Sequence, residues 1–172
     1  SSLFIHGNQR TKEMDGNGDS FLDVPLAKQV NILNRWQYTN ANKGWVGFGS
    51  FRLMRDEKTL GSLGFNPEED RNNFALWGSQ IDTNIIDTSL KIGYVFPELS
   101  YKSFGFQSAY SQHKQEAYYG YRVYNIDHQS LYTNFLYNSI IGNTKNKFKA
   151  GMNFSYDRYL ETVDTFYFNR SD

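Results

Sequence analysis

The sequence has no cysteine and no long apolar run. Without cysteine among its 172 residues, the chain has neither disulfides nor thiolate metal sites. A helical membrane span needs about 18 or more consecutive apolar residues, and the apolar runs here are only a few residues long. Helical spans are therefore excluded, but a β-barrel is not, because the lumen face of a barrel is polar.

The chain also lacks an excess of charge. Its 18 basic and 18 acidic residues give a formal net charge of zero, and no basic stripe points to nucleic acid. Residues 1–7 lack the charged and apolar regions of a signal peptide. An exported protein needs a signal peptide. If this chain is exported, we expect that signal to have been removed or to lie upstream.

Catalytic motifs are absent too. Residues 68–70 form a charge run typical of a solvated surface, and the serine at 62 lacks the strand–turn–helix context of a nucleophile. No segment has a convincing helical period, and no glycine loop of the phosphate-binding type precedes one. We therefore predict no enzymatic activity.

Two segments alternate almost without error between apolar and polar residues. In residues 86–96 the apolar side chains fall on even positions, and residues 148–156 repeat that pattern. Because successive side chains of a strand point to opposite faces, each segment has one apolar and one polar face. Both segments are predicted strands, and a strand at 30–38 shows the same phase.

The connections between the predicted strands differ in length. Residues 96–101 and 141–147 are short and polar, whereas residues 55–84 and 113–128 are predicted as long loops. For residues 74–81, a strand extension is the alternative. Short turns at one end and long loops at the other are typical of outer-membrane barrels. The sequence thus predicts an all-β fold, an antiparallel transmembrane β-barrel segment of about six or seven strands with short periplasmic turns and long extracellular loops.

Aromatic residues gather beside the predicted short turns. They are Trp36, Tyr38 and Trp45 at one turn, and Tyr94, Phe96 and Tyr101 at the next. A ring of aromatics at one level is favoured at a membrane interface. Ordinary cross-strand aromatic pairing is the alternative explanation.

An Asp- and Asn-rich segment near the N-terminus has the spacing of a calcium loop. Asp15, Asn17, Asp19 and Asp23 occupy positions 1, 3, 5 and 9 of such a loop, and the carbonyl of Phe21 occupies position 7. Positions 6 and 12 carry Ser and Leu rather than Gly and Glu, so this is no true EF-hand. A bound Ca²⁺ and an Asx-rich turn that binds nothing are the two readings.

Several segments resemble barrel segments of TonB-dependent outer-membrane receptors of the Bacteroidetes type. They are DGNGDSFLDVP at 15–25, QVN at 29–31, NRWQY at 34–38, KIGYVFP at 91–97, YTN at 132–134, KFKAGM at 147–152 and DRYLE at 157–161. Such receptors have a barrel of about 22 strands around an N-terminal plug. The resemblance implies that residues 1–172 are part of the barrel only, without the plug, the TonB-interacting segment or the C-terminal strands.

The resemblance also implies a function and partners. The whole protein would lie in the bacterial outer membrane and import a scarce ligand, such as a siderophore, haem, cobalamin or glycan. Energy would come from TonB, acting indirectly through the plug. The implied partners are outer-membrane lipid, the rest of the barrel, the plug and the small-molecule or glycan ligand.

Tyrosines and one arginine in the segment 113–128 are the candidate ligand contacts. They are Tyr118, Tyr119, Tyr121, Arg122 and Tyr124, whose aromatic faces and guanidinium suit a sugar, chelate or cobamide-like ligand. The alternative is that they are packed loop aromatics. His113 and His128 flank the same segment and are expected to approach each other across it, either near a metal or haem or as exposed strand-end residues.

A different class of protein fits the same features. A secreted calcium-dependent β-sandwich binding module would use the 15–23 loop for a structural ion and the tyrosine segment for glycans. The two hypotheses differ in what covers the apolar side of each strand, since a sandwich buries it in a core and a barrel exposes it to lipid.

Overall fold

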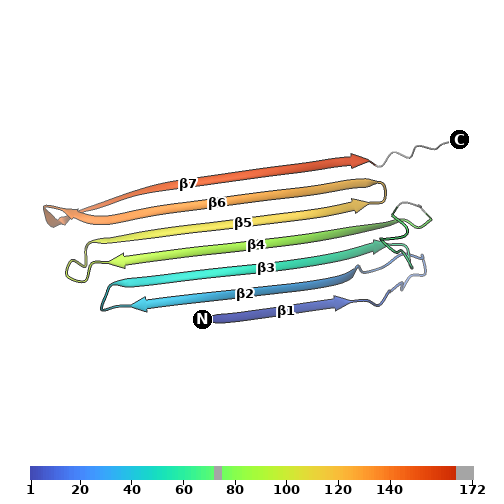
Figure 1. Cartoon of the computed structure of the whole chain (residues 1–172), viewed down its shortest axis with the longest axis horizontal. Helices are drawn as coiled ribbons and strands as arrows, with labels where there is room; N and C mark the ends of the chain where they lie inside the picture. Colours follow the sequence, from blue (N-terminus) through green and yellow to red (C-terminus); the bar gives the residue numbers. More distant parts are fainter. Residues whose placement is uncertain (72–74, 166–172) are drawn as a thin grey trace.

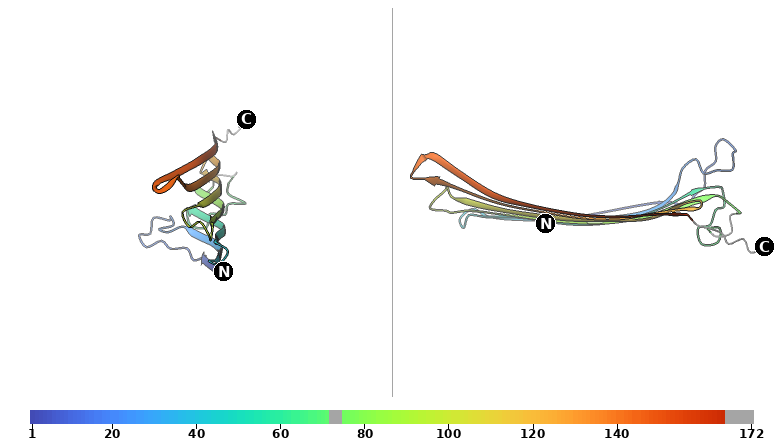
Figure 2. Two further views of the ribbon diagram at one scale, coloured as in Figure 1. Left: turned by 90° about the vertical axis from the view of Figure 1, so that its left-hand side faces the viewer. Right: turned by 90° about the horizontal axis from the view of Figure 1, so that it is seen from above.

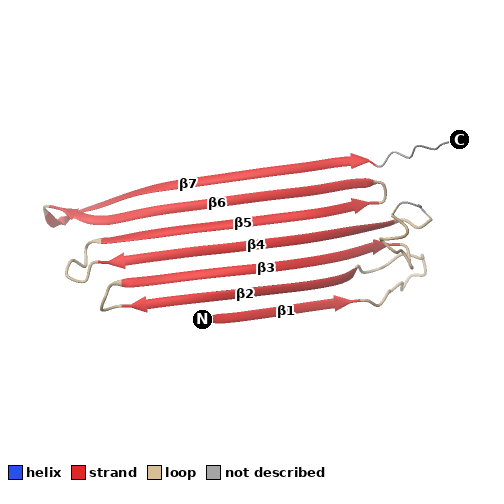
Figure 3. Cartoon of the chain, in the orientation of Figure 1, coloured by secondary structure: helices blue, strands red, loops and turns tan. Residues whose placement is uncertain are grey.

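The computed structural model describes residues 1–71 and 75–165. These residues form one antiparallel sheet of seven strands, which lie side by side in chain order (Figure 1) and include no helix (Figure 3). The strands are β1 (Ser2–Arg10), β2 (Leu26–Asn40), β3 (Trp45–Gly61), β4 (Gly78–Val95), β5 (Ser103–Tyr119), β6 (Arg122–Ile141) and β7 (Asn143–Thr165). The all-β antiparallel prediction is confirmed, and the described residues offer no helix able to cross a membrane.

The sheet is a single curved layer, which Figure 2 shows edge-on. Among the described residues, the buried hydrophobic side chains are Phe65, Ala117 and Tyr118, and all three lie at one end of the sheet. Along the rest of the strands most residues are half-buried or exposed, and the other buried strand residues are Asp56, Gly61, Gly78 and Ser79. The described residues therefore contain no second layer to bury a conventional core.

The two ends of the sheet differ in their connections. At the end that we call the hairpin end, residues 41–44, residues 96–102 and Gly142 join neighbouring strands. The loop end carries two longer segments, 11–25 and 62–77, and the short turn 120–121 (Figure 1). Long loops were predicted at this end. Segments 11–25 and 62–77 are long, whereas the turn 120–121 is short.

The long loop predicted at 113–128 was wrong, and the one predicted at 55–84 is shorter than expected. The alternative of a strand at 74–81 is correct from Gly78 onward, and residue 74 lies outside the described residues. β5 and β6 continue to a turn of Gly120 and Tyr121, and only residues 62–77 separate β3 from β4. In these outer parts of the strands both faces are rich in polar side chains, so the alternation that marks a strand disappears from the sequence. The ladder of backbone hydrogen bonds nevertheless continues, with Glu57 opposite Asp82 and Lys114 opposite Asp127.

The register sets which side chains share a face. Ile92 of β4 lies opposite Phe106 of β5, which lies opposite Phe135 of β6, which in turn lies opposite Met152 of β7. We call this face A; it carries the even positions of β2, β4, β5 and β7 and the odd positions of β1, β3 and β6. Face B carries the remaining positions. The predicted apolar sets of 30–38, 86–96 and 148–156 thus fall together on face A.

Gly44 closes the β2–β3 turn in a conformation that other residues adopt at a cost. Its φ is 73°, and a Cβ there would overlap the carbonyl oxygen of Val95. Its own carbonyl accepts a hydrogen bond of 2.8 Å from the Val95 N–H, which ties this turn to the end of β4. Close backbone approach and a left-handed φ both favour glycine here.

Replacing Gly44 with Ala is expected to lower the free energy of unfolding by about 2 kcal/mol, from the strained φ and the displaced Val95 carbonyl. Urea unfolding of the refolded chain measures this change. Gly105→Ala is the control, because a Cβ at Gly105 meets nothing within 4 Å and its φ is not left-handed. Equal losses in the two variants would contradict the role assigned to Gly44.

Candidate functional site

Face A carries an apolar band next to the hairpin end. The band comprises the face A side chains of residues 30–38 in β2, 45–53 in β3, 86–94 in β4, 104–110 in β5, 131–137 in β6 and 148–156 in β7. Many of its large side chains are exposed, and Met152 retains 77% of its accessible surface. Apolar patches of this extent are rare on proteins surrounded by water.

Toward the loop end, the band gives way to charged and polar side chains. On face A, the next positions include Arg55 and Glu57 of β3, joined by an ion pair of 2.8 Å, and Lys114 and Glu116 of β5, joined at 2.6 Å. Asp82 lies between them on β4; burial raises its pKa, and the nearby Glu57 and Glu116 add to that rise. We call this part of face A the charged zone.

Aromatic rings gather at the hairpin margin of the band. The ring of Tyr94 lies 4.6 Å from that of Trp45 and 5.4 Å from that of Phe104, measured between centroids. Phe104 in turn stacks on Phe135 at 6.4 Å. These residues come from β3, β4, β5 and β6, so the aromatics form a row across the sheet. The predicted clustering beside the short turns therefore extends over four strands.

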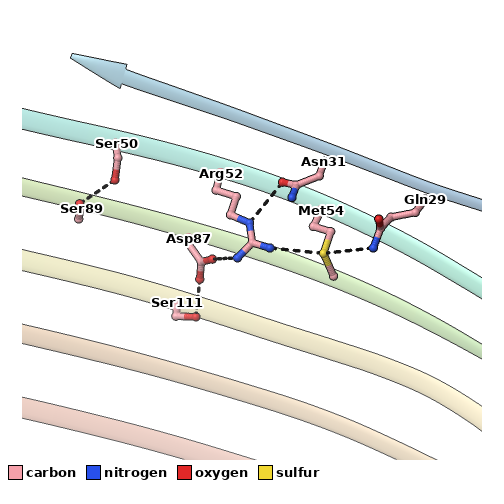
Figure 4. Close-up of polar contacts among 8 residues, drawn as sticks. All are labelled: Gln29, Asn31, Ser50, Arg52, Met54, Asp87, Ser89 and Ser111. Atoms are coloured by element: carbon pink, nitrogen blue, oxygen red, sulfur yellow. Dashed lines mark hydrogen bonds and ion pairs between the residues drawn. The ribbon is translucent and has the colours of Figure 1, made fainter. Parts of the chain in front are cut away.

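Face B carries a polar network at the level of the band (Figure 4). The guanidinium of Arg52 donates to Asp87 Oδ2 at 3.3 Å and to Asn31 Oδ1 at 3.3 Å, and Ser111 Oγ donates to Asp87 Oδ1 at 2.7 Å. The network links four neighbouring strands, β2 to β5. Sequence analysis missed it, because Arg52 and Asp87 meet only through the strand register.

His113 and His128 lie directly opposite each other on face B, as their flanking positions predicted. Nε2 of His128 lies 3.3 Å from Asp157 Oδ1, whereas Nε2 of His113 is covered and has no hydrogen-bond partner. Among the described residues, no group of three or more His, Cys, Asp or Glu side chains is placed to hold a metal ion.

The five predicted ligand contacts do not share a face. Tyr118 is on face A, is 4% exposed and packs under the guanidinium of Arg71 at 4.5 Å. Tyr119, Arg122 and Tyr124 lie on face B, and Tyr121 lies in the turn between the strands. Burial raises the pKa of Tyr118, and hydrogen bonds to Glu161 and Tyr159 raise that of Tyr124. The structure therefore places these residues in three locations, namely face A, face B and the turn.

The predicted calcium loop is closed by its own backbone. Asp15 accepts hydrogen bonds from the N–H groups of Gly18 at 2.7 Å and Ser20 at 3.0 Å, and Asp19 accepts one from Phe21 at 2.9 Å. Asp23 accepts one from Gly16 at 2.6 Å. These are Asx-turn contacts, which hold the loop in shape without an ion.

Comparisons with protein-family models, with curated proteins and with solved structures found no match for this chain.

Calcium binding by residues 15–23 remains a prediction. Millimolar Ca²⁺ should raise the melting temperature by a few degrees, because a ligand that binds the folded state alone stabilises it. Asp19→Ala should abolish that rise, whereas Glu98→Ala, which removes a carboxylate at the hairpin end, should leave it unchanged. The same melting temperature with and without Ca²⁺ in the parent chain would leave the loop a hydrogen-bonded turn.

Proposed function

We propose that this sheet is part of the wall of a bacterial outer-membrane β-barrel, with the apolar band of face A against lipid and face B toward the lumen. The observation that carries the proposal is the limited height of the band. In β4 it runs from Ile86 to Tyr94, about nine residues of a strand that continues to Gly78. A tilted strand crosses the bilayer core in about 9 to 11 residues.

The margins of the band support a membrane rather than a second protein layer. Aromatic rings at the hairpin margin suit the headgroup region, where an amphipathic ring is half in water. At the other margin the charged zone begins, and ion pairs such as Arg55–Glu57 are compatible with water but not with lipid. In a sandwich the apolar face would be expected to run the length of the packed strands, whereas here it ends about halfway along strands of 17 to 20 residues.

The polar network of face B supports a water-filled interior. Arg52 and Asp87 lie at the level of the band but on the opposite face, where lumen side chains of a barrel are polar. Both side chains remain about one-third exposed, so they are open to solvent or to a segment that enters the lumen.

Together with the resemblance of residues 15–25 and 91–97, these features favour a segment of a TonB-dependent transporter. In that function the wall separates lipid from a lumen through which a scarce ligand passes, and the loop end meets the ligand first. Its partners are outer-membrane lipid, the rest of the barrel and the plug, through which TonB acts. The polar lumen face and the loop end form its part of the ligand path.

The second candidate is a secreted calcium-dependent β-sandwich module, which the calcium-loop spacing of the carboxylates at 15–23 favours. In that protein another sheet covers face A. The two candidates differ in one measurable property, namely whether side chains of the apolar band contact lipid or protein.

Single cysteines distinguish these candidates, because the chain has no native cysteine. In outer-membrane vesicles, Ile92→Cys and Phe154→Cys should react with bilayer-restricted probes and resist water-soluble thiol reagents. Lys91→Cys and Ser155→Cys are matched controls at the same level on face B, and they should react from the aqueous side. Asn84→Cys, in the polar part of face A, should also react with water-soluble reagents.

Labelling of Ile92→Cys and Phe154→Cys by water-soluble reagents would refute the lipid contact. Protection of both from every reagent would indicate a covering protein layer and favour the sandwich.

A further inference from the structure

Three aromatic side chains from different connections lie together at the loop end. They are Phe21 of segment 11–25, Trp77 of segment 62–77 and Tyr121 of the β5–β6 turn. The rings of Phe21 and Trp77 lie 6.2 Å apart at 45°, and Trp77 and Tyr121 line the same small hollow. Their exposed fractions are 43%, 48% and 46%. We call these three residues the loop platform.

Backbone contacts hold the platform in place. Segment 11–25 is tied to segment 62–77 and the end of β3 by hydrogen bonds of 2.9 Å from Leu22 to Gly61 and from Leu63 to Ser20. The carbonyl of Trp77 accepts a hydrogen bond of 2.9 Å from Ser62, and its ring lies against Gly120, where a Cβ would displace it. A surface ordered before binding loses less entropy when a ligand arrives.

The chemistry of the platform favours a neutral ligand. Segment 11–25 carries four acidic residues and one basic residue, and segment 62–77 carries three acidic residues and one basic residue. This excess of negative charge disfavours anionic ligands such as carboxylate chelates. A cation above an open ring gains only a weak cation–π attraction, because water competes for it, and Phe21 and Trp77 are open to solvent.

The shape of the platform favours a ligand that lies on a surface. The hollow beside Trp77 and Tyr121 has a volume of about 40 Å³, far below the roughly 300 Å³ or more of a pocket that encloses a whole ligand. It has room for one small polar substituent. A pyranose ring has an apolar C–H face that can lie on an aromatic ring, and a hydroxymethyl group of the size that the hollow admits.

We propose that Phe21, Trp77 and Tyr121 form a binding platform for neutral glycans. The proposal rests on the proposed function in one respect, because it needs the loop end to lie outside the membrane. Of the ligands expected for that function, it selects neutral glycans. It also differs from the expected contact set, because Phe21 and Trp77 replace the buried Tyr118 and the face B residues.

Affinity electrophoresis of the refolded chain in mild detergent tests this proposal. The gels contain dextran, galactomannan, xyloglucan or mixed-linkage β-glucan as neutral probes, and polygalacturonate or chitosan as charged probes. At least one neutral polysaccharide should retard the parent chain, equally at low and high salt. Trp77→Ala and Phe21→Ala should each weaken that retardation at least tenfold.

Tyr101→Ala is the matched control, because Tyr101 is similarly exposed but lies in a turn at the hairpin end; it should bind like the parent. Trp77→Phe keeps an aromatic ring and should retain part of the affinity if Trp77→Ala does not fold. No retardation by any neutral probe, equal retardation of all variants, or salt-sensitive binding to a charged probe alone would overturn the proposal.

The cysteine labelling separates this result from the membrane hypothesis. If the band is labelled by lipid probes but no glycan binds, the glycan-platform hypothesis is refuted and the barrel-wall hypothesis stands. If a neutral glycan binds but the band is not labelled by lipid probes, the glycan-platform hypothesis stands and the barrel-wall hypothesis is refuted.

Discussion

The structure depends on one constraint, the phase of the strand register. Because the described sheet is a single layer, each apolar side chain is directed to face A or face B by its position alone. A slip of one residue would move the apolar set of a strand to the other face. Short turns such as the one closed by Gly44 fix the phase, and the described ladders keep it across seven strands, with one irregularity between Ile140 and Ile141.

This phase creates two different halves along the strands. Near the hairpin end, the two faces differ sharply, with the apolar band on one side and the Arg52 network on the other. Near the loop end, the backbone ladder and ion pairs such as Lys114–Glu116 continue the sheet without an apolar face. In this second half the strands are polar on both faces, and they place the loops at a distance from the apolar band.

The sequence predicted the first half well and the second half poorly, for a physical reason. Alternation at 86–96 and 148–156 is a direct result of one apolar face, and glycine and asparagine at 40–44 mark a turn. Residues 112–119 and 122–129 carry no such contrast, so their pairing, apart from the expected approach of His113 and His128, became visible only in the structure. Contacts such as Phe21–Trp77 join residues far apart in the chain, and no local pattern encodes them.

The charged zone lies between the apolar band and the loop platform. If lipid covered the loop platform as well as the band, Arg55, Glu57, Lys114 and Glu116 would all have to enter the bilayer with it. Placing even one charged side chain at the bilayer centre costs several kcal/mol, so one membrane cannot cover both surfaces. The proposed lipid contact therefore does not extend to the rings of Phe21 and Trp77, for which we propose the glycan platform instead.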